Sequence, residues 1–309
     1  MRIFTRVLYS ILVLGMTPFL HTKVDFFESM GWHLPKNIES INRIFFANHE
    51  VAQNSLRRIH LLKNLYDKNH FSQDSTHKPH RIPKKIHQIW VGPNKPPAIF
   101  AESQRSIQHL HPDWEYKLWT DADVPAFQLH NEGLYNSSVN YGEKADILRY
   151  EILYRIGGIY LDIDFVCLKP LDVLLQYDLC ASIQPLDCDA DLANGIIGSA
   201  PWNPILEDCI LRLKDTWHDF HPLSVLDKSG PRHFQKSFMK FAAHETMNII
   251  AFPKSYFYPI DLEDRLIGLV NHNGQNNLRI ESLIRPESFA VHYWAGSWWK
   301  IAENDELIK

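Results

Sequence analysis

The sequence predicts an α/β domain with a largely parallel central sheet, which begins near Arg81 and occupies most of the 309 residues. Short apolar segments bounded by proline and glycine alternate with segments of helical periodicity, and this alternation is typical of parallel sheets. A helical stripe ends at the pair Gly157–Gly158, and a strongly apolar segment follows it. A hydrophobic content of 45% and a charged content of 22% are ordinary for a folded soluble domain.

The first predicted elements are a strand, a helix and a second strand. The first strand covers residues 84–92 (KKIHQIWVG) and lies between Pro83 and a turn glycine. Residues 98–111 (AIFAESQRSIQHLH) favour a helix, and residues 115–120 (EYKLWT) favour a short strand that ends before Asp121. The alternation of strand and helix therefore starts close to the beginning of the domain.

A longer helix and a buried strand come next. Residues 143–156 (EKADILRYEILYRI) carry apolar side chains at helical spacing and end at Gly157, a residue type typical of helix C-termini. Residues 159–168 (IYLDIDFVCL) predict a buried strand. Further strands are predicted at CASIQP and NGIIGSA, and a helix is predicted over residues 204–217.

Two aspartates interrupt this buried strand, although carboxylates are costly to bury without a partner. Four D-x-D pairs occur in the chain, but only Asp162 and Asp164 lie in apolar sequence after a helix and a glycine turn. On a strand Tyr160, Asp162 and Asp164 would share one face, so that the two carboxylates can hold Mg²⁺ or Mn²⁺. Capping of the strand, or pairing with a nearby arginine, is the alternative interpretation. Asp146 and Arg149, at i, i+3 spacing on the preceding helix, by themselves favour a surface salt bridge.

The N-terminal eighty residues have a different character. Arg2 and Arg6 precede or flank the apolar run Val7–Leu20, whose length suits a signal-peptide core better than a membrane span of about 20 residues. We predict a signal anchor or a signal peptide at residues 1–22, with a buried helix as a further alternative. Residues 23–80 combine helical periodicity with a polar, histidine-rich end and predict a helical stem and linker. The arginines would remain cytoplasmic, which places the rest of the chain across the membrane.

Charge and cysteine content limit the partners of the protein. A net charge of −4 and a pI near 6.5 argue against a general polyanion-binding surface, so we expect no nucleic-acid partner. The four cysteines form no C-x-x-C pair and no zinc-binding spacing, and they permit a disulfide without requiring one.

Several motifs occur together in one order: IPKKIHQIWVG, HPDWEYKLW, and then EKADILRYEILYRIGGIYLDIDFVCLKPLD. With them, the region from about Ile82 to Trp299 resembles the catalytic core of glycosyltransferase family 32, the D-x-D sugar transferases related to fungal α-mannosyltransferases and inositol-phosphoceramide mannosyltransferases. It is similar, more distantly, to the clostridial glucosylating toxins. The resemblance implies a single GT-A domain of Rossmann type over residues 81–309. It also implies a metal-dependent, retaining transfer of a hexose (mannose, glucose or galactose) from a UDP- or GDP-linked nucleotide sugar to a glycan or glycolipid.

The resemblance assigns functions to individual residues. It implies that Asp164 is a direct metal ligand and that Asp162 contacts the metal or the ribose, with these two aspartates as the catalytic residues. His292, which lies before Ser297–Trp298 in the closing motif VHYWAGSWW, is the third candidate ligand for Mn²⁺ or Mg²⁺. The expected donor-binding residues are Trp90, Asp146, Arg149, Tyr160, Asn194, Ser297 and Trp298.

Alternative interpretations concern both single residues and the function. Trp90 can be a core tryptophan, Asn194 a turn residue, and His292 a packed core histidine. The segment DIDFV also fits the start of the haloacid-dehalogenase-like phosphatases, in which Asp162 would be a nucleophile. A catalytically inactive relative that binds sugar or lipid is the third alternative, and the intact charged residues of the two motifs argue against it.

The expected location follows from the donor and the N-terminus. Nucleotide sugars are present in the cytosol and in the eukaryotic Golgi lumen. A single-pass signal anchor therefore suits a membrane-associated enzyme with a lumenal, Golgi-like catalytic domain. In a bacterium the catalytic domain would instead be secreted or face the cytoplasm.

Overall fold

The structure, a computed structural model, describes residues 23–34, 37–46, 49–71, 79–217, 224–264 and 280–296. Its centre is a six-stranded sheet in the order β2-β1-β3-β6-β5-β7. These strands are β1 (Lys85–Ile89), β2 (Glu115–Trp119), β3 (Gly158–Leu161), β5 (Leu179–Ile183), β6 (Leu192–Ser199) and β7 (Ile249–Phe252). Strand β6 runs antiparallel to both of its neighbours, β3 and β5, whereas the other adjacent pairs are parallel. The predicted α/β class with a mostly parallel sheet is confirmed.

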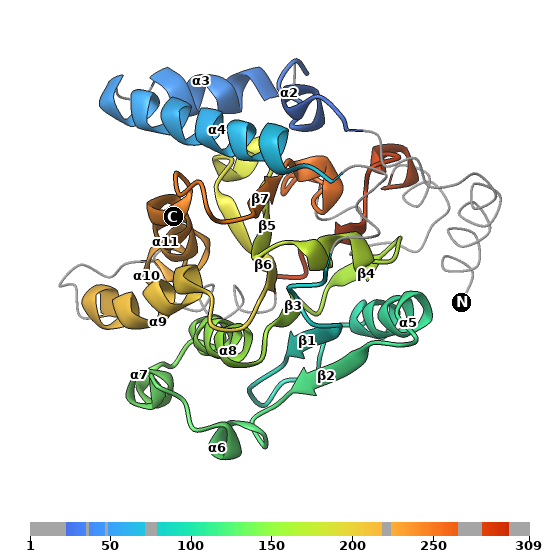
Figure 1. The fold of residues 1–309 in the computed structure, drawn as a ribbon, viewed down its shortest axis with the longest axis vertical. Helices are drawn as coiled ribbons and strands as arrows, with labels where there is room; N and C mark the ends of the chain where they lie inside the picture. The colour runs from blue at the N-terminus through green and yellow to red at the C-terminus, as the bar shows by residue number, and fades with distance from the viewer. Residues whose placement is uncertain are drawn as a thin grey trace.

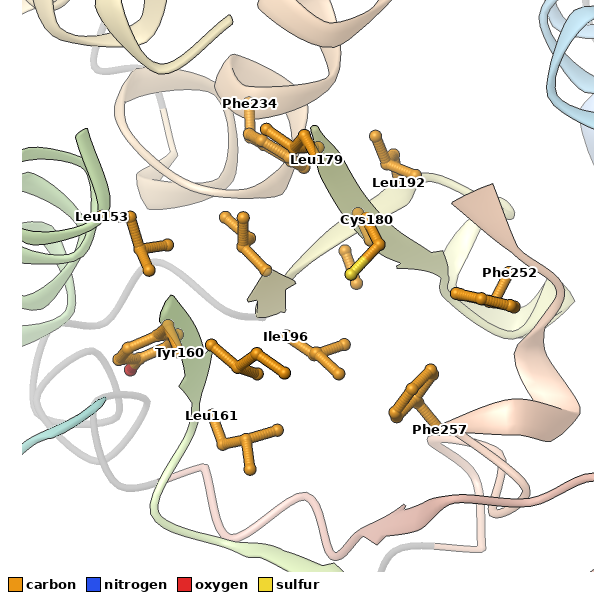
Figure 2. Packing of buried hydrophobic residues seen from close by; sticks show 14 of the residues in the cluster. Leu153, Tyr160, Leu161, Leu179, Cys180, Leu192, Ile196, Phe234, Phe252 and Phe257 are labelled. Carbon is orange, nitrogen blue, oxygen red and sulfur yellow. The ribbon is translucent and has the colours of Figure 1, made fainter. Parts of the chain in front are cut away.

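Helices lie on both sides of this sheet (Figure 1). On one side lie α8 (Tyr141–Ile156), α9 (Pro204–Trp217) and α11 (Pro231–Phe241), and on the other lies α5 (Phe100–Leu110). The short helices are α6 (Val124–Phe127), α7 (Glu132–Ser137) and α10 (Val225–Lys228), and the 3₁₀ turns are η3 (Asp172–Gln176), η4 (Leu186–Cys188) and η5 (Lys254–Tyr256). Figure 2 shows part of the buried core around the strands, including Leu153, Ile196, Phe234 and Phe252. Burial of this apolar surface stabilises the layered arrangement.

Helix α8 ends where the sequence predicts. Gly157 follows its last residue with a φ of 68°, and the Gly157 amide donates to the Leu153 carbonyl at 2.9 Å. This left-handed conformation favours glycine, and a Cβ atom here would lie 2.8 Å from the Pro201 side chain. The tight turn leads the chain from α8 directly into β3, which pairs with β1.

The strand predicted over residues 159–168 is divided, which corrects the sequence-based prediction. Strand β3 ends at Leu161, and a turn follows that is closed by the hydrogen bond from Phe165 N to Asp162 O at 3.1 Å. Asp162 and Asp164 therefore lie in a turn and do not share one face of a strand. The prediction failed because a run of apolar residues continues through the turn and hides it.

A second, two-stranded sheet explains why the chain turns here. Strand β4 (Phe165–Cys167) pairs antiparallel with β8 (Ala290–His292), which places Phe165 opposite His292. Strand β8 comes from the far end of the described chain. The pairing brings His292 next to the turn that carries the two aspartates.

Among the described residues, three helices precede the sheet: α2 (Phe26–Ser29), α3 (Ile38–Phe46) and α4 (His49–Asn69). Helix α4 lies against β7, and the Tyr66 hydroxyl lies 2.8 Å from the Tyr256 hydroxyl. Within the described ranges, no helix has both the length and the apolar character that a membrane crossing requires. The signal anchor or signal peptide predicted at residues 1–22 lies outside the described residues. The division into a stem at residues 23–80 and a catalytic domain stays a prediction.

Candidate active site

A pocket lies at the carboxyl ends of β1 and β3, the edge at which ligands bind in α/β sheets. Its lining includes eight residues that the sequence analysis identified: Trp90, Asp146, Arg149, Tyr160, Asp162, Asp164, Asn194 and His292. They come from α8, from three strands and from the segments that follow β1 and β3. The other two candidates, Ser297 and Trp298, lie outside the described residues.

Asp162, Asp164 and His292 form a cluster in this pocket. The Nε2 atom of His292 lies 3.2 Å from Oδ1 of Asp164 and 3.9 Å from Oδ2 of Asp162. One ligand atom from each of the three residues lies within 4.8 Å of the other two. Mn²⁺ accepts carboxylate and imidazole ligands, and Mg²⁺ prefers oxygen ligands. The three side chains thus have the chemistry and the spacing that a divalent metal ion requires.

Asp164 is held at its main chain and at its side chain. The amide of Ala295 donates to Oδ2 at 2.7 Å, and the amide of Tyr293 donates to the main-chain oxygen at 3.1 Å. Burial alone would raise the pKa of Asp164, but His292 and the Ala295 amide outweigh it and hold the pKa below its usual value. The carboxylate is therefore ionised, and Oδ1 is the oxygen that faces His292.

The ring of His292 is oriented by aromatic packing. It lies edge-on to Trp294 at 4.5 Å and packs against Phe165 at 4.7 Å and Tyr258 at 5.1 Å, measured between ring centroids. Its Nδ1 atom has no hydrogen-bond partner among the described residues. Burial would lower the pKa of His292, but Asp164 and Asp162 raise it above its usual value. The residue is thus packed as a core histidine would be, while its Nε2 atom faces two carboxylates.

One carboxylate oxygen of Asp162 is hydrogen-bonded to protein, and the other lies on the side of His292. Arg149 Nη2 and the Tyr160 hydroxyl both donate to Oδ1, at 3.0 Å and 2.6 Å. Oδ2 lies on the side of His292 and Gly195. Burial raises the pKa of Asp162 above its usual value, although Arg149 opposes the shift. The alternative that an aspartate pairs with an arginine is therefore correct for Oδ1, and it leaves Oδ2 for a ligand.

The Asp146–Arg149 pair is buried, which corrects the interpretation as a surface salt bridge. The two side chains are 7% and 6% exposed, and Arg149 Nη1 lies 3.3 Å from Asp146 Oδ1. Nη1 also donates to the main-chain oxygen of Asn194 at 2.6 Å, and the guanidinium lies over the Tyr160 ring at 4.2 Å. The bonds of Nη1 and Nη2 hold the guanidinium beside the cluster, whereas Nε has no hydrogen-bond partner among the described residues.

Asp146 also connects α8 to two other segments. Asn194 Nδ2 donates to Oδ1 at 2.8 Å, and Ser229 Oγ donates to Oδ2 at 2.8 Å. Burial raises the pKa of Asp146 to about 6, although Arg149 and Ser229 oppose the shift. Asn194 belongs to β6, so the interpretation of Asn194 as a turn residue is wrong. Asp146 therefore fixes the positions of Asn194 and Arg149 at the wall of the pocket.

Trp90 lies at the end of β1, lines the pocket and is partly exposed. Its indole N–H donates to the main-chain oxygen of Asn94 at 2.6 Å, and its main-chain amide donates to Trp119 at 2.8 Å. These bonds hold the indole outside the buried core, so the interpretation as a core tryptophan is wrong. A pocket-lining indole has the flat, polarisable surface on which a nucleobase can stack.

The aspartates of the other D-x-D pairs do not line the pocket. Asp121 and Asp123 accept main-chain amides in loops near β2. Asp191 is buried and lies 3.1 Å from Arg232, whereas the Asp189 side chain is 41% exposed. The apolar context of Asp162 and Asp164 therefore identified the pair that lies in the pocket.

Four further residues shape the site but could not be predicted from the sequence: Gly195, Tyr258 and Trp294 at the cluster, and Ser229 at Asp146. Tyr258 and Trp294 pack against His292, and Gly195 gives room to Asp162. No spacing relative to the motifs identifies them. The aromatic segment FPKSYFYPI around Tyr258 is the one local signal, and it is equally typical of a core.

A family comparison identifies the region that carries the motifs. Residues 97–180 match the family described as "Glycosyltransferase sugar-binding region containing DXD motif". This region contains α8, the Asp146–Arg149 pair and both aspartates of the turn. The resemblance inferred from the motifs is confirmed for this region, which is similar to glycosyltransferase sugar-binding regions.

Individual relatives match part of the chain. Inositol phosphoceramide mannosyltransferase 3 of Schizosaccharomyces pombe is 36% identical over 160 residues, which are 48% of this chain and 43% of that protein. Mannosyl phosphorylinositol ceramide synthase SUR1 of Saccharomyces cerevisiae is 32% identical over 165 residues, 51% of this chain and 42% of that protein. Subversion of eukaryotic traffic protein A of Legionella pneumophila is 29% identical over 159 residues, 41% of this chain and 24% of that protein. The chain spans about half the length of the first curated relatives that it matches.

Two glycosyltransferases are among the solved structures to which this chain is similar. The PaToxG glycosyltransferase has 18% sequence identity and a TM-score of 0.43, covering 61% of this chain and 79% of that chain. The galactosyltransferase LgtC in complex with donor and acceptor sugar analogs has 13% identity and a TM-score of 0.37, covering 69% of this chain and 88% of that chain.

Proposed function

We propose that this sugar-binding region belongs to a metal-dependent, retaining glycosyltransferase that moves a hexose from a nucleotide sugar to a glycan or glycolipid. The observation that carries the proposal is the meeting of Asp162, Asp164 and His292 in one pocket beside the buried pair Asp146–Arg149. A metal-binding cluster and a buried cation at one site are what the departure of a charged diphosphate requires.

The cluster supplies the ligands for the metal ion. Asp162 Oδ2, Asp164 Oδ1 and His292 Nε2 would hold it, because these atoms face one another and the remaining oxygens of both aspartates are hydrogen-bonded to protein. A divalent cation bound here supplies positive charge to the diphosphate that leaves the sugar. We favour Mn²⁺ because imidazole is among its accepted ligands, with Mg²⁺ as the second candidate.

Arg149 and Trp90 support a nucleotide sugar as the donor. The guanidinium of Arg149 lies 3.0 Å from Asp162, directly beside the cluster. A guanidinium binds phosphate oxygens and hydroxyls through a planar fork of donors. We therefore assign the diphosphate to the part of the pocket that Arg149 and the cluster line together, and the nucleobase to the indole of Trp90. Asp146 and Tyr160 hold the guanidinium in place, and Asp146 is also our candidate for the donor sugar hydroxyls.

The matched relatives suggest the order in which substrates should be tested. The names of these relatives state mannosyl transfer and inositol phosphoceramide or phosphorylinositol ceramide. We propose mannose as the first candidate sugar, with glucose and galactose as alternatives, from a UDP- or GDP-linked donor. A glycolipid is the first candidate acceptor. Association with a membrane through residues 1–22 and closure of Ser297–Trp298 over the donor remain part of the proposal.

Two other functions are weaker candidates. The phosphatase alternative requires Asp162 as a nucleophile, but the match of residues 97–180 to a sugar-binding region favours the transferase. An inactive sugar- or lipid-binding relative would not need the charged residues that the pocket brings together. Turnover of a donor distinguishes this relative from an enzyme.

The test is the release of nucleoside diphosphate from donors by the full chain with Mn²⁺. UDP- and GDP-linked mannose, glucose and galactose are supplied singly, with and without inositol phosphoceramide as acceptor. Asp164→Asn should abolish hydrolysis and transfer, because it removes a charged ligand at nearly constant volume. Asp189→Asn is the control. Asp189 is 41% exposed at its side chain and has a φ of 58°, which asparagine tolerates, so this variant should keep most of the activity. Inactivity of the wild type towards every donor, or an active Asp164→Asn variant, would contradict the proposal.

A further inference from the structure

Tyr258 has a hydroxyl that faces the pocket without a described protein partner. The residue lines the pocket and is 1% exposed. No residue in the described part of the chain forms a hydrogen bond with this hydroxyl, whereas the hydroxyls of Tyr150, Tyr160 and Tyr256 are all bonded. Buried tyrosine hydroxyls normally find a partner. An unbonded hydroxyl that opens to a pocket therefore indicates a ligand.

The ring of Tyr258 is fixed by its neighbours. It packs against Phe165 at 5.4 Å, His292 at 5.1 Å and Trp294 at 5.6 Å between centroids, with interplanar angles of 73°, 61° and 43°. The Tyr258 amide donates to the Lys254 carbonyl at 2.7 Å, which holds the main chain after η5. A ring held in this way loses little additional freedom when its hydroxyl binds a ligand. The hydroxyl is pre-organised.

The Tyr258 hydroxyl and Asp162 Oδ2 both lie close to Gly195. A Cβ atom at Gly195 would lie 2.8 Å from the Tyr258 hydroxyl and 2.6 Å from Asp162 Oδ2. The two oxygens thus approach the same glycine, whereas Arg149 binds the other oxygen of Asp162. A ligand that reaches the cluster through Oδ2 would also come within reach of the Tyr258 hydroxyl.

We propose that Tyr258 donates a hydrogen bond to an oxygen of the donor diphosphate beside the metal cluster. This inference rests on the proposed glycosyltransferase function. A phenol is protonated at neutral pH, so the hydroxyl is a donor to an oxygen that carries negative charge. The charge on the diphosphate grows as the sugar departs, and a pre-positioned donor stabilises this change. Arg149 on one side of Asp162 and Tyr258 on the other then bind the same diphosphate.

The substitution Tyr258→Phe tests the inference, because it removes one oxygen and keeps the packed ring. Calorimetry of the full chain measures the affinity for Mn²⁺ alone, and then the affinities for UDP and for GDP at saturating Mn²⁺. We expect unchanged affinity for Mn²⁺ and an affinity about tenfold weaker for the diphosphate that the wild type binds, as for loss of one hydrogen bond to a charged group. Turnover of the matching donor should fall by a similar or larger factor.

Tyr256→Phe is the matched control. The Tyr256 hydroxyl lies 2.8 Å from that of Tyr66 and 2.9 Å from His70 Nε2, away from the pocket lining. This variant should lower the melting temperature and leave the affinity for the diphosphate unchanged. The Tyr258→Phe variant should show the opposite pattern, with a preserved melting temperature and a weakened affinity.

The possible results separate the inference from the proposed function. Equal affinity of wild type and Tyr258→Phe for the diphosphate overturns the inference and leaves the function standing. A loss confined to the intact nucleotide sugar, with unchanged diphosphate affinity, also overturns it and assigns the hydroxyl to the sugar. If the wild type binds neither UDP nor GDP with Mn²⁺, the proposed function fails and the inference fails with it.

Discussion

Replacing Gly195 by alanine tests the geometry of the proposed metal site formed by Asp162, Asp164 and His292. A Cβ atom here would lie 2.6 Å from Asp162 Oδ2 and 2.8 Å from the Tyr258 hydroxyl, whereas ordinary van der Waals contact begins at 3.4 Å. Gly195 lies in β6, and its φ is outside the left-handed region, so alanine adds no backbone strain. The substitution therefore acts through its methyl group on the two oxygens that face the cluster.

The structure sets the size of the expected effect. Asp162 Oδ2 must retreat by about 0.8 Å to restore an ordinary contact with the new methyl group. The carboxylate has little freedom to retreat, because Arg149 and Tyr160 hold its other oxygen. The main-chain amide of Asp162 also donates to the Gly195 carbonyl at 2.8 Å, which fixes the backbone. A misplacement of about 1 Å at a reacting centre can reduce turnover about 100-fold. We expect a loss of this order, together with weaker Mn²⁺ binding.

Two other glycines provide the controls for this substitution. At Gly198, on the same strand, a Cβ atom would lie 2.6 Å from Cys180 Sγ, so Gly198→Ala should lower the melting temperature without weakening Mn²⁺ binding. At Gly133, in α7, no heavy atom lies within 4 Å, so Gly133→Ala should preserve both properties. Calorimetric Mn²⁺ affinity and donor hydrolysis are measured for all three variants. Wild-type values of both in Gly195→Ala would refute the assignment of Asp162 Oδ2 to the metal.

Two further predictions concern the guanidinium beside the cluster and a buried histidine. Arg149→Lys keeps the charge, but one ammonium cannot replace both arms of a buried guanidinium, so donor turnover should fall at least about tenfold and the melting temperature should also fall. Normal turnover in this variant would show that Arg149 has a structural function only. Burial lowers the pKa of His87 to about 4, below the usual value of about 6.5, so the unfolded state binds the proton first as the pH falls. His87 should therefore reduce the free energy of unfolding by about 2 kcal/mol between pH 7 and pH 5. Denaturant unfolding of His87→Gln should show a smaller decrease than the wild type, and equal decreases would contradict the burial argument.

Helices and strands whose limits depend on residues nearby in the sequence could be predicted from the sequence. Helix α9 covers residues 204–217 as predicted, and α8 ends at Gly157, because helical periodicity and a terminal glycine act over a few residues. Strands β1, β2, β5 and β6 lie where short apolar runs between turns indicated them. Their alternation with helices predicted the mostly parallel sheet.

The apolar context and the order of the motifs were also enough to predict which pair of aspartates lies in the pocket. The other side chains around this pair could be found only from the packing of the folded chain. The turn after β3 depends on the pairing of β4 with β8, which brings His292 from the far end of the described chain. No local sequence pattern predicts that Tyr258 lines the pocket, or that Asp162 Oδ2 lies close to Gly195. Periodicity reports which face of an element is buried, whereas the direction of one hydroxyl and the room for one carboxylate depend on every close-packed neighbour around them.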